Sequence, residues 1–199
     1  MMIKTMFTCA LTAAWLVAGA LNAPATETDA GRAELQSLSG TYASPAPEPW
    51  YGGFGTRRFT FQDGAWGLVF IHALDPEMKV ETFRFRTEGP YRIGEASASV
   101  AGAFEAVFFE DVKYVTLLTA DQAIVEAFGM AGCGLKTGVE IDISATGCAG
   151  WKPVSVCRED HDLLSLSADG LHFGVRPQDN DMCAAERRPT ALLPAVVKQ

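Results

Sequence analysis

The chain has 199 residues, with 24 acidic side chains against 16 lysines and arginines, and its formal net charge is −8. Such an acidic chain has no general attraction for nucleic acid or for anionic membranes, and the Arg187-Arg188 pair is too short to change that.

The first 25 residues have the pattern of an export signal. Lys4 supplies the positive charge, and an apolar run over residues 6–21 leads to small residues, so we expect cleavage after Ala25. A membrane anchor is the alternative, but the apolar run is short for a spanning helix. We therefore expect one mature domain, residues 26–199, that is periplasmic or secreted.

The mature chain keeps four cysteines, Cys133, Cys148, Cys157 and Cys183. An even number in an exported chain predicts disulfides, and the absence of a Cys-x-x-Cys pair argues against zinc. We expect Cys133–Cys148 and Cys157–Cys183, because each pair encloses a strand-and-turn unit. The nested pairing, with Cys148–Cys157 inside Cys133–Cys183, is the main alternative.

Short alternating segments dominate the rest of the chain and predict strands. They cover residues 41–43, 54–61, 66–72, 82–86, 91–93, 103–109, 114–118, 139–143, 163–167, 171–175 and 191–197. The last segment contains Pro194, which lacks a backbone N–H, so we expect it to be an edge strand. One or two helical turns fit residues 33–38, and a helix fits 120–128 with Thr119 and Gln122 as a capping box. These elements predict an antiparallel β-barrel or half-barrel, lipocalin-like in shape; a two-sheet sandwich is the alternative.

Turn residues predict how the strands connect. Glu88-Gly89-Pro90 separates two strands, Glu110-Asp111 joins a hairpin, and Ala168-Asp169-Gly170 joins another. Residues 44–53 form a long loop rich in proline and glycine that carries Trp50 and Tyr51. With Phe54, these aromatic residues either fold back as a plug over the core or cover the mouth of a pocket.

Several short motifs occur in a fixed order. They are Gly40-Thr41-Tyr42 with Ser44, Phe54-Gly55-Thr56-Arg57-Arg58-Phe59 with Phe61, Asp75-Pro76, Phe83 with Phe85, Gly89 with Tyr91, and Gly102-Ala103 with Glu105. This order resembles the domain of the adenomatosis-polyposis-coli-down-regulated proteins, which are Wnt antagonists in animals, over residues 38–190. The resemblance implies an antiparallel barrel with an apolar cavity that takes up lipid, and it implies no catalytic residues. Lipocalins are similar only in Gly40-Thr41-Tyr42.

The residues suggest little catalytic chemistry. The three histidines are His72, His161 and His172; we expect His161 in an exposed turn and His172 pointing to solvent, which leaves no metal site. Glu105 with Glu110, or Asp160 with Asp162, could form carboxylate pairs, but acidic turns explain them better. No nucleophile elbow, phosphate loop or dinucleotide fingerprint is present.

Arg57 is the most informative charged residue. If Phe59 and Phe61 face the barrel interior, period two places Arg57 on the same face and Arg58 outside. A buried guanidinium needs partners, so Arg57 either pairs with Glu105 or orients the carboxylate or headgroup of a ligand.

We expect a non-catalytic binding protein without a cofactor, a monomer whose partner is a hydrophobic small molecule or an acyl lipid. The candidate ligand-binding residues are Trp50, Tyr51, Phe54, Arg57, Phe59, Phe61, Phe83, Phe85, Tyr91 and Arg92. The alternative is a protein-interaction module whose barrel is filled by its own side chains.

Overall fold

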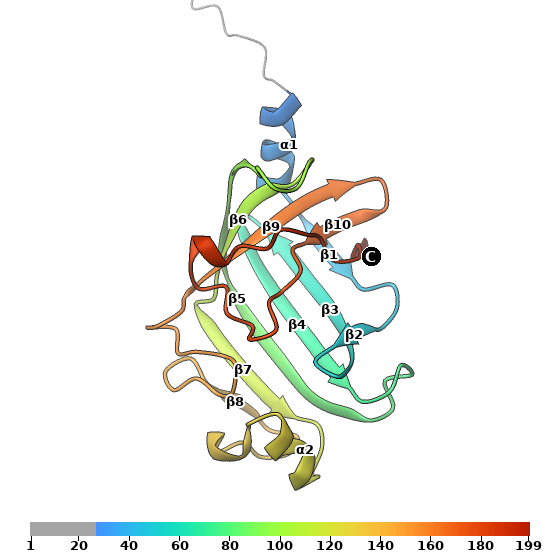
Figure 1. Ribbon diagram of the computed structural model, residues 1–199, viewed down its shortest axis with the longest axis vertical. Coiled ribbons are helices and arrows are strands. Elements are labelled where there is room, and N and C mark those ends of the chain that lie inside the picture. Colours follow the sequence, from blue (N-terminus) through green and yellow to red (C-terminus); the bar gives the residue numbers. More distant parts are fainter. Residues whose placement is uncertain (1–26) are drawn as a thin grey trace, which may run out of the picture.

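The computed structural model describes residues 27–199, which form a nearly closed antiparallel β-barrel with two α-helices (Figure 1). The expected signal peptide, residues 1–25, lies outside the described residues. The helices are α1 (Glu27–Gln36) and α2 (Gln122–Ala127), with 3₁₀ turns η1 (Ala131–Cys133) and η2 (Ala185–Arg187). The strands are β1 (Gly40–Ala43), β2 (Glu48–Trp50), β3 (Gly53–Gln62), β4 (Ala65–Ala73), β5 (Glu81–Ala96), β6 (Phe104–Phe109), β7 (Val112–Leu117), β8 (Glu140–Asp142), β9 (Glu159–Ser167), β10 (Gly170–Phe173) and β11 (Val197–Lys198).

The strands follow one path around the barrel, β10-β9-β6-β5-β4-β3-β1-β11. The C-terminal segment then returns to the start of this path, because Leu171 of β10 and Val196 exchange two backbone hydrogen bonds of 2.9 Å each. The predicted barrel is therefore confirmed, and the β9–β10 hairpin forms across residues 168–169 as expected. The segment 191–197 runs beside β10 through single bridges at Leu192 and Val196 instead of forming a continuous strand.

Strand β5 is continuous through Gly89 and Pro90, where the sequence predicted a turn between two strands. Up to Glu88 the strand pairs with β7, and from Tyr91 onward it pairs with β6. A side chain at Gly89 would overlap the carbonyl oxygen of Phe109, so only glycine allows the backbones to approach this closely. The turn-forming residues thus mark the point where one long strand changes its partner.

The predicted hairpin across Glu110-Asp111 is wrong. Strands β6 and β7 both pair antiparallel with β5, Tyr91 opposite Phe108 and Phe83 opposite Leu117, so they follow one another along the same edge. The break between them occurs where Glu110 N–H donates to the carbonyl of Arg158 and Asp111 N–H to that of Glu88. This break turns the Glu110 side chain toward the interior, where it is buried.

Residues 44–53 are not an open loop. They contain β2, which pairs with β3 and places Trp50 opposite Gly53. Tyr51 and Gly52, with φ of 48° and 80°, make the tight turn between the two strands. Trp50 is thereby held on the sheet, and its ring packs against Phe70 with centroids 5.4 Å apart.

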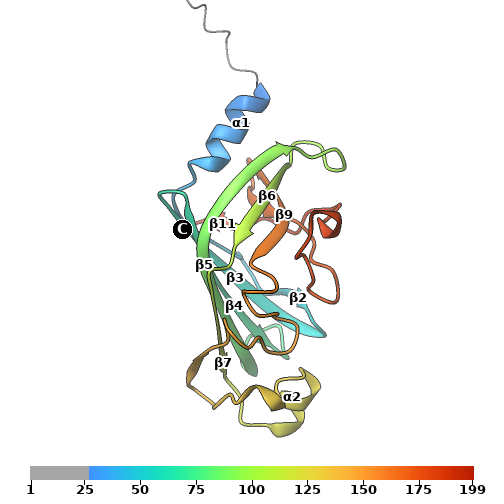
Figure 2. The same ribbon diagram turned by 90° about the vertical axis from the view of Figure 1, so that its left-hand side faces the viewer.

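The helices lie at opposite ends of the barrel (Figure 2). Helix α1 covers one end of the barrel, where Leu35 in the helix and Leu38 just after it are buried. The Tyr91 hydroxyl fixes the end of the helix by donating to the carbonyls of Leu35 and Gln36 at 2.9 Å. Helix α2 is shorter than predicted. Its N-cap is Asp121, whose carboxylate accepts from the Ala123 amide at 2.9 Å, so the proposed Thr119 cap is wrong.

Two buried clusters fill the two ends of the barrel. The first, next to α1, includes Phe59, Phe61, Trp66, Tyr91, Phe108 and Phe173. The second, next to α2, includes Phe70, Phe83, Phe85, Val115, Leu117 and Met130. Leu68 packs against both clusters, so the region between them is the centre of the barrel.

Both predicted disulfides are confirmed, Cys133–Cys148 and Cys157–Cys183. Disulfides are typical of compartments outside the reducing cytoplasm. In the part of the chain that the structure describes, no helix has the length and apolarity needed to cross a membrane.

Candidate functional site

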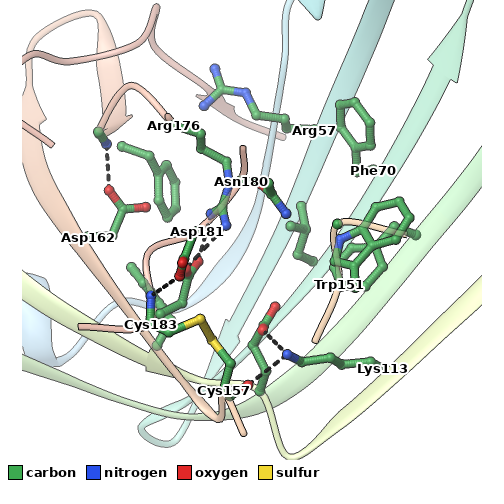
Figure 3. Close-up of a pocket in the computed structure, with 18 of the residues that line it drawn as sticks. Arg57, Phe70, Lys113, Trp151, Cys157, Asp162, Arg176, Asn180, Asp181 and Cys183 are labelled. Carbon is green, nitrogen blue, oxygen red and sulfur yellow. Dashed lines mark hydrogen bonds and ion pairs between the residues drawn. A yellow bond between two sulfur atoms is a disulfide. The ribbon is translucent and has the colours of Figure 1, made fainter. Parts of the chain in front are cut away.

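A cavity of about 70 Å³ lies at the centre of the barrel, between the two core clusters. Its apolar lining comes from Trp50, Phe59, Trp66, Leu68, Phe70, Phe85, Phe108, Trp151, Phe173 and Leu193. Its charged and polar lining includes Tyr51, Arg57, Glu110, Lys113, Lys152, Asp160, Asp162, Arg176, Asn180 and Asp181. Figure 3 shows Arg57 and Phe70 on one side of this space and Asp162 on the other.

The aromatic wall depends on a glycine. Gly55 faces inward on β3, and a Cβ there would lie 2.5 Å from the Phe70 ring and 3.1 Å from Trp50 Cδ1. Without that side chain, both rings lie directly over the strand. Trp151 covers the far part of the wall by stacking on Phe85 at 4.7 Å.

His72 holds Trp50 in place from behind. Its Nε2 lies 3.0 Å from the Trp50 carbonyl oxygen and its Nδ1 lies 2.7 Å from Thr82 Oγ1. Burial lowers the pKa of His72, so the neutral tautomer donates from Nε2 to Trp50. This histidine is therefore a structural group behind the cavity wall.

Two ion pairs form part of the cavity lining. Arg176 binds both carboxylate oxygens of Asp160, at 2.6 and 3.1 Å, and its Nε donates to Asn180 Oδ1 at 2.6 Å. Lys113 is almost completely buried and lies 2.8 Å from Glu110. Burial, reinforced by the nearby charge of Asp160, raises the pKa of Glu110.

Asp162 is a second buried carboxyl group of the cavity whose pKa is raised. Its Oδ1 accepts from the amides of Leu163 at 2.7 Å and Gly174 at 2.9 Å. Burial, with a smaller contribution from the Asp160 charge, raises its pKa to about 7, although Arg176 opposes this. Asp162 is therefore partly protonated near neutral pH.

Arg57 is buried as predicted, but its partner is not Glu105. Its Nη2 donates to Glu48 Oε1 at 2.9 Å and to the carbonyl of Pro194 at 2.8 Å. Glu105 instead pairs with Arg188 at 3.3 Å on the outside of the barrel. Pairing β2 with β3 brings Glu48 beside Arg57, and the sequence reading had assigned Glu48 to an unstructured loop.

The exposed lining residues mark the mouth of the cavity. They are Tyr51, Gly150 and Lys152, contributed by the β2–β3 turn and by the loop after Cys148. The Tyr51 hydroxyl donates to Asn180 Oδ1 at 2.9 Å, which joins this turn to the segment that carries Arg176. This bond spans 129 positions in the sequence, so only the folded chain forms the mouth.

The structure divides the ten predicted ligand-binding residues into three groups. Those that line the cavity are Trp50, Tyr51, Arg57, Phe59 and Phe85. Those buried in the core away from it are Phe61, Phe83 and Tyr91. Phe54 alternates with the inward Gly55, and Arg92 is exposed with its guanidinium 5.8 Å from the Phe109 ring, so these two lie on the outer face.

Asp160 and Asp162 were assigned to acidic turns, and this was wrong. Both lie in β9, which begins at Glu159, and both are buried. The expectation that His161 lies in an exposed turn was also wrong: it lies between the two aspartates in β9, its side chain is only 14% exposed, and its Nε2 is 3.3 Å from Glu159. The period-two signal was present, since Asp160, Asp162 and Leu164 share one face. The strand was not predicted there because the inward positions carry charged residues instead of the apolar residues that usually mark the buried face. His172 is also half-buried, with Nδ1 3.0 Å from the Leu193 carbonyl.

Within residues 27–199, no group of three or more His, Cys, Asp or Glu side chains is placed to hold a metal ion. No protein-family model matches the chain, and no curated protein matches its sequence.

Proposed function

We propose that this protein is a non-catalytic carrier or sensor that binds a compact hydrophobic molecule inside its barrel. The observation that carries the proposal is the central cavity, in which an aromatic wall faces a set of polar groups. Binding sites for small molecules combine an apolar lining with a few fixed polar groups in this way.

The size of the cavity favours a compact ligand. Its volume of about 70 Å³ exceeds the ~10–15 Å³ that one water molecule needs, but it is below the ~300–1,000 Å³ of typical ligand pockets. A long acyl chain would require the mouth near Tyr51 and Lys152 to open further. A small aromatic or branched molecule needs less rearrangement.

Binding is a better proposal than catalysis because the charged groups are already engaged. Lys113, Arg176 and Arg57 each have a carboxylate partner within 2.9 Å, so none of them is a free cation.

The two disulfides and the expected signal peptide support a periplasmic or secreted location. The short motifs between Gly40 and Glu105 support a relationship to the adenomatosis-polyposis-coli-down-regulated domain that the sequence resembles.

A protein-interaction module remains the second candidate. The observation that favours it is the small cavity, since side chains of the two clusters fill most of the barrel. In that case the loops at the mouth would bind a partner and the cavity would bind nothing.

Intrinsic fluorescence tests the proposal directly. Trp50, Trp66 and Trp151 all line the cavity, and they are the only tryptophans in the described part of the chain. A bound hydrophobic molecule should therefore shift or quench the emission in a saturable manner. Native mass spectrometry of protein purified from its export compartment should show a copurified small molecule.

Two leucine variants provide a matched control. Leu68→Phe enlarges a side chain that lines the cavity, whereas Leu166→Phe enlarges a partly buried leucine that does not. Leu68→Phe should lower ligand affinity and Leu166→Phe should not. A clean apo mass, together with no fluorescence change for any hydrophobic compound, would favour the interaction module.

A further inference from the structure

Two side chains of the cavity lining carry buried hydrogen-bond donors that have no partner among the described residues. Trp50 Nε1, Arg57 Nε and Arg57 Nη1 are buried and have no hydrogen-bond partner among residues 27–199. Both side chains line the cavity, and the Arg57 guanidinium carbon lies 5.9 Å from the centroid of the Trp50 ring. Buried donors without partners are rare, and each leaves a desolvation cost that a ligand acceptor would remove.

Every lysine and arginine that lines the cavity has a carboxylate partner within the described part of the chain. These four cations form the ion pairs Arg57–Glu48 at 2.9 Å, Lys113–Glu110 at 2.8 Å, Lys152–Asp181 at 2.8 Å and Arg176–Asp160 at 2.6 Å. The other titratable side chains in the lining are Asp162 and Tyr51, and each of them can add only negative charge. A ligand carboxylate would therefore be an extra anion without a counter-charge in a poorly hydrated site.

We propose, on the basis of the proposed binding function, that the polar group of the ligand is an uncharged acceptor, the carbonyl of a ketone, ester or amide. Trp50 Nε1 and Arg57 donate to this carbonyl, and the hydrophobic part of the ligand contacts the aromatic wall. A carbonyl satisfies the donors without disturbing the balance of ion pairs. The interior position of Arg57 had suggested a ligand with a carboxylate. Because Arg57 already pairs with Glu48, it does not need a ligand carboxylate as its counter-charge.

Three probes of nearly the same shape test the proposal by calorimetric titration at neutral pH. Benzylacetone carries a methyl ketone, hydrocinnamate carries a carboxylate in its place, and butylbenzene carries neither. The wild-type protein should bind benzylacetone at least about tenfold more tightly than hydrocinnamate, because the carboxylate is buried without a counter-charge. Butylbenzene should bind more weakly than the ketone, because it leaves the donors unsatisfied.

Two conservative variants identify the groups responsible. Trp50→Phe keeps an aromatic side chain, although a smaller one, and removes the Nε1 donor, so it should weaken benzylacetone about fivefold more than it weakens butylbenzene. Glu48→Gln keeps an oxygen that accepts from Arg57 and Ser44 but removes the negative charge behind Arg57. This variant should strengthen hydrocinnamate binding and reduce the preference for the ketone.

The outcomes separate this inference from the proposed function. If wild-type protein binds hydrocinnamate as tightly as benzylacetone, or if Trp50→Phe weakens all three probes equally, the carbonyl assignment is overturned while the binding function stands. If none of the probes binds wild-type protein, both are overturned. Thermal melting of each variant without ligand establishes that it is folded.

Discussion

The carbonyl oxygen of Phe109 lies directly against the α-carbon of Gly89, at the point where β5 exchanges β7 for β6 as its partner. The same oxygen accepts a hydrogen bond of 3.1 Å from Trp66 Nε1, so the contact connects the bend in β5 to the cavity wall.

We expect Gly89→Ala to destabilise the protein by about 2–3 kcal/mol, because the added methyl group would overlap the Phe109 oxygen and must displace it. Urea denaturation followed by far-UV circular dichroism measures this change. Gly132→Ala is the matched control, since no atom lies within 4 Å of a Cβ built at Gly132, and it should be nearly neutral. Equal effects of the two variants would contradict the proposed contact.

Asp162 should make the free energy of unfolding depend on pH. Its pKa is raised from 3.8 to about 7, so its contribution to stability is fully present below pH ~4 and is lost as pH rises to about 7. Asp162→Asn keeps an oxygen for the amides of Leu163 and Gly174 but cannot ionise. The variant should match wild type near pH 4 and exceed it by up to about 4 kcal/mol above pH 7.

Denaturation curves from pH 4 to 8 test this prediction for Asp162. Asp63→Asn is the control, because Asp63 is exposed in the β3–β4 turn at φ 51°, which asparagine also tolerates. It should leave the pH dependence unchanged. A constant difference between Asp162→Asn and wild type at every pH would show that Asp162 does not titrate in this range.

The Arg57–Glu48 ion pair should be costly to break from one side. Arg57→Met leaves the Glu48 carboxylate buried without its cation, and we expect a loss of about 3–5 kcal/mol. Replacing both residues by methionine should restore part of that loss, since no uncompensated charge remains.

Glu105→Ala serves as the control for that pair, because Glu105 binds Arg188 on the outside at 3.3 Å with an exposed side chain. Glu105→Ala should lower the free energy of unfolding by no more than about 1 kcal/mol. If Glu105→Ala were as damaging as Arg57→Met, the predicted Arg57–Glu105 pairing would have to be considered again.

The two disulfides should affect binding differently. Replacing either pair by alanines should cost about 3–4 kcal/mol of stability, since the pairs close loops of 15 and 26 residues. Cys157 and Cys183 line the cavity, whereas Cys133 and Cys148 do not.

Removal of Cys157–Cys183 should therefore also lower the affinity for benzylacetone, and removal of Cys133–Cys148 should leave it unchanged. Calorimetric titration at a temperature where both variants are folded measures this contrast. Equal affinities in the two variants would show that the Cys157–Cys183 bond does not shape the cavity.

The sequence by itself determined the local structure of this protein. Alternation of apolar and polar residues located most of the strands, and Arg57 was placed inside because it shares the face of Phe59 and Phe61. The cysteine spacing predicted both disulfides. These inferences succeed because strand periodicity and short loop closure depend on nearby residues.

Only the tertiary structure decided how the strands pair and which charges meet. Gly89 and Pro90 are typical of a turn, yet close contact with Phe109 makes them the bend of one long strand. Arg57 could not be matched to Glu48, because a strand pairing inside an expected loop brings them together. The buried carboxylates of β9 looked like a solvated turn, since their burial depends on Arg176 and on backbone amides elsewhere in the chain.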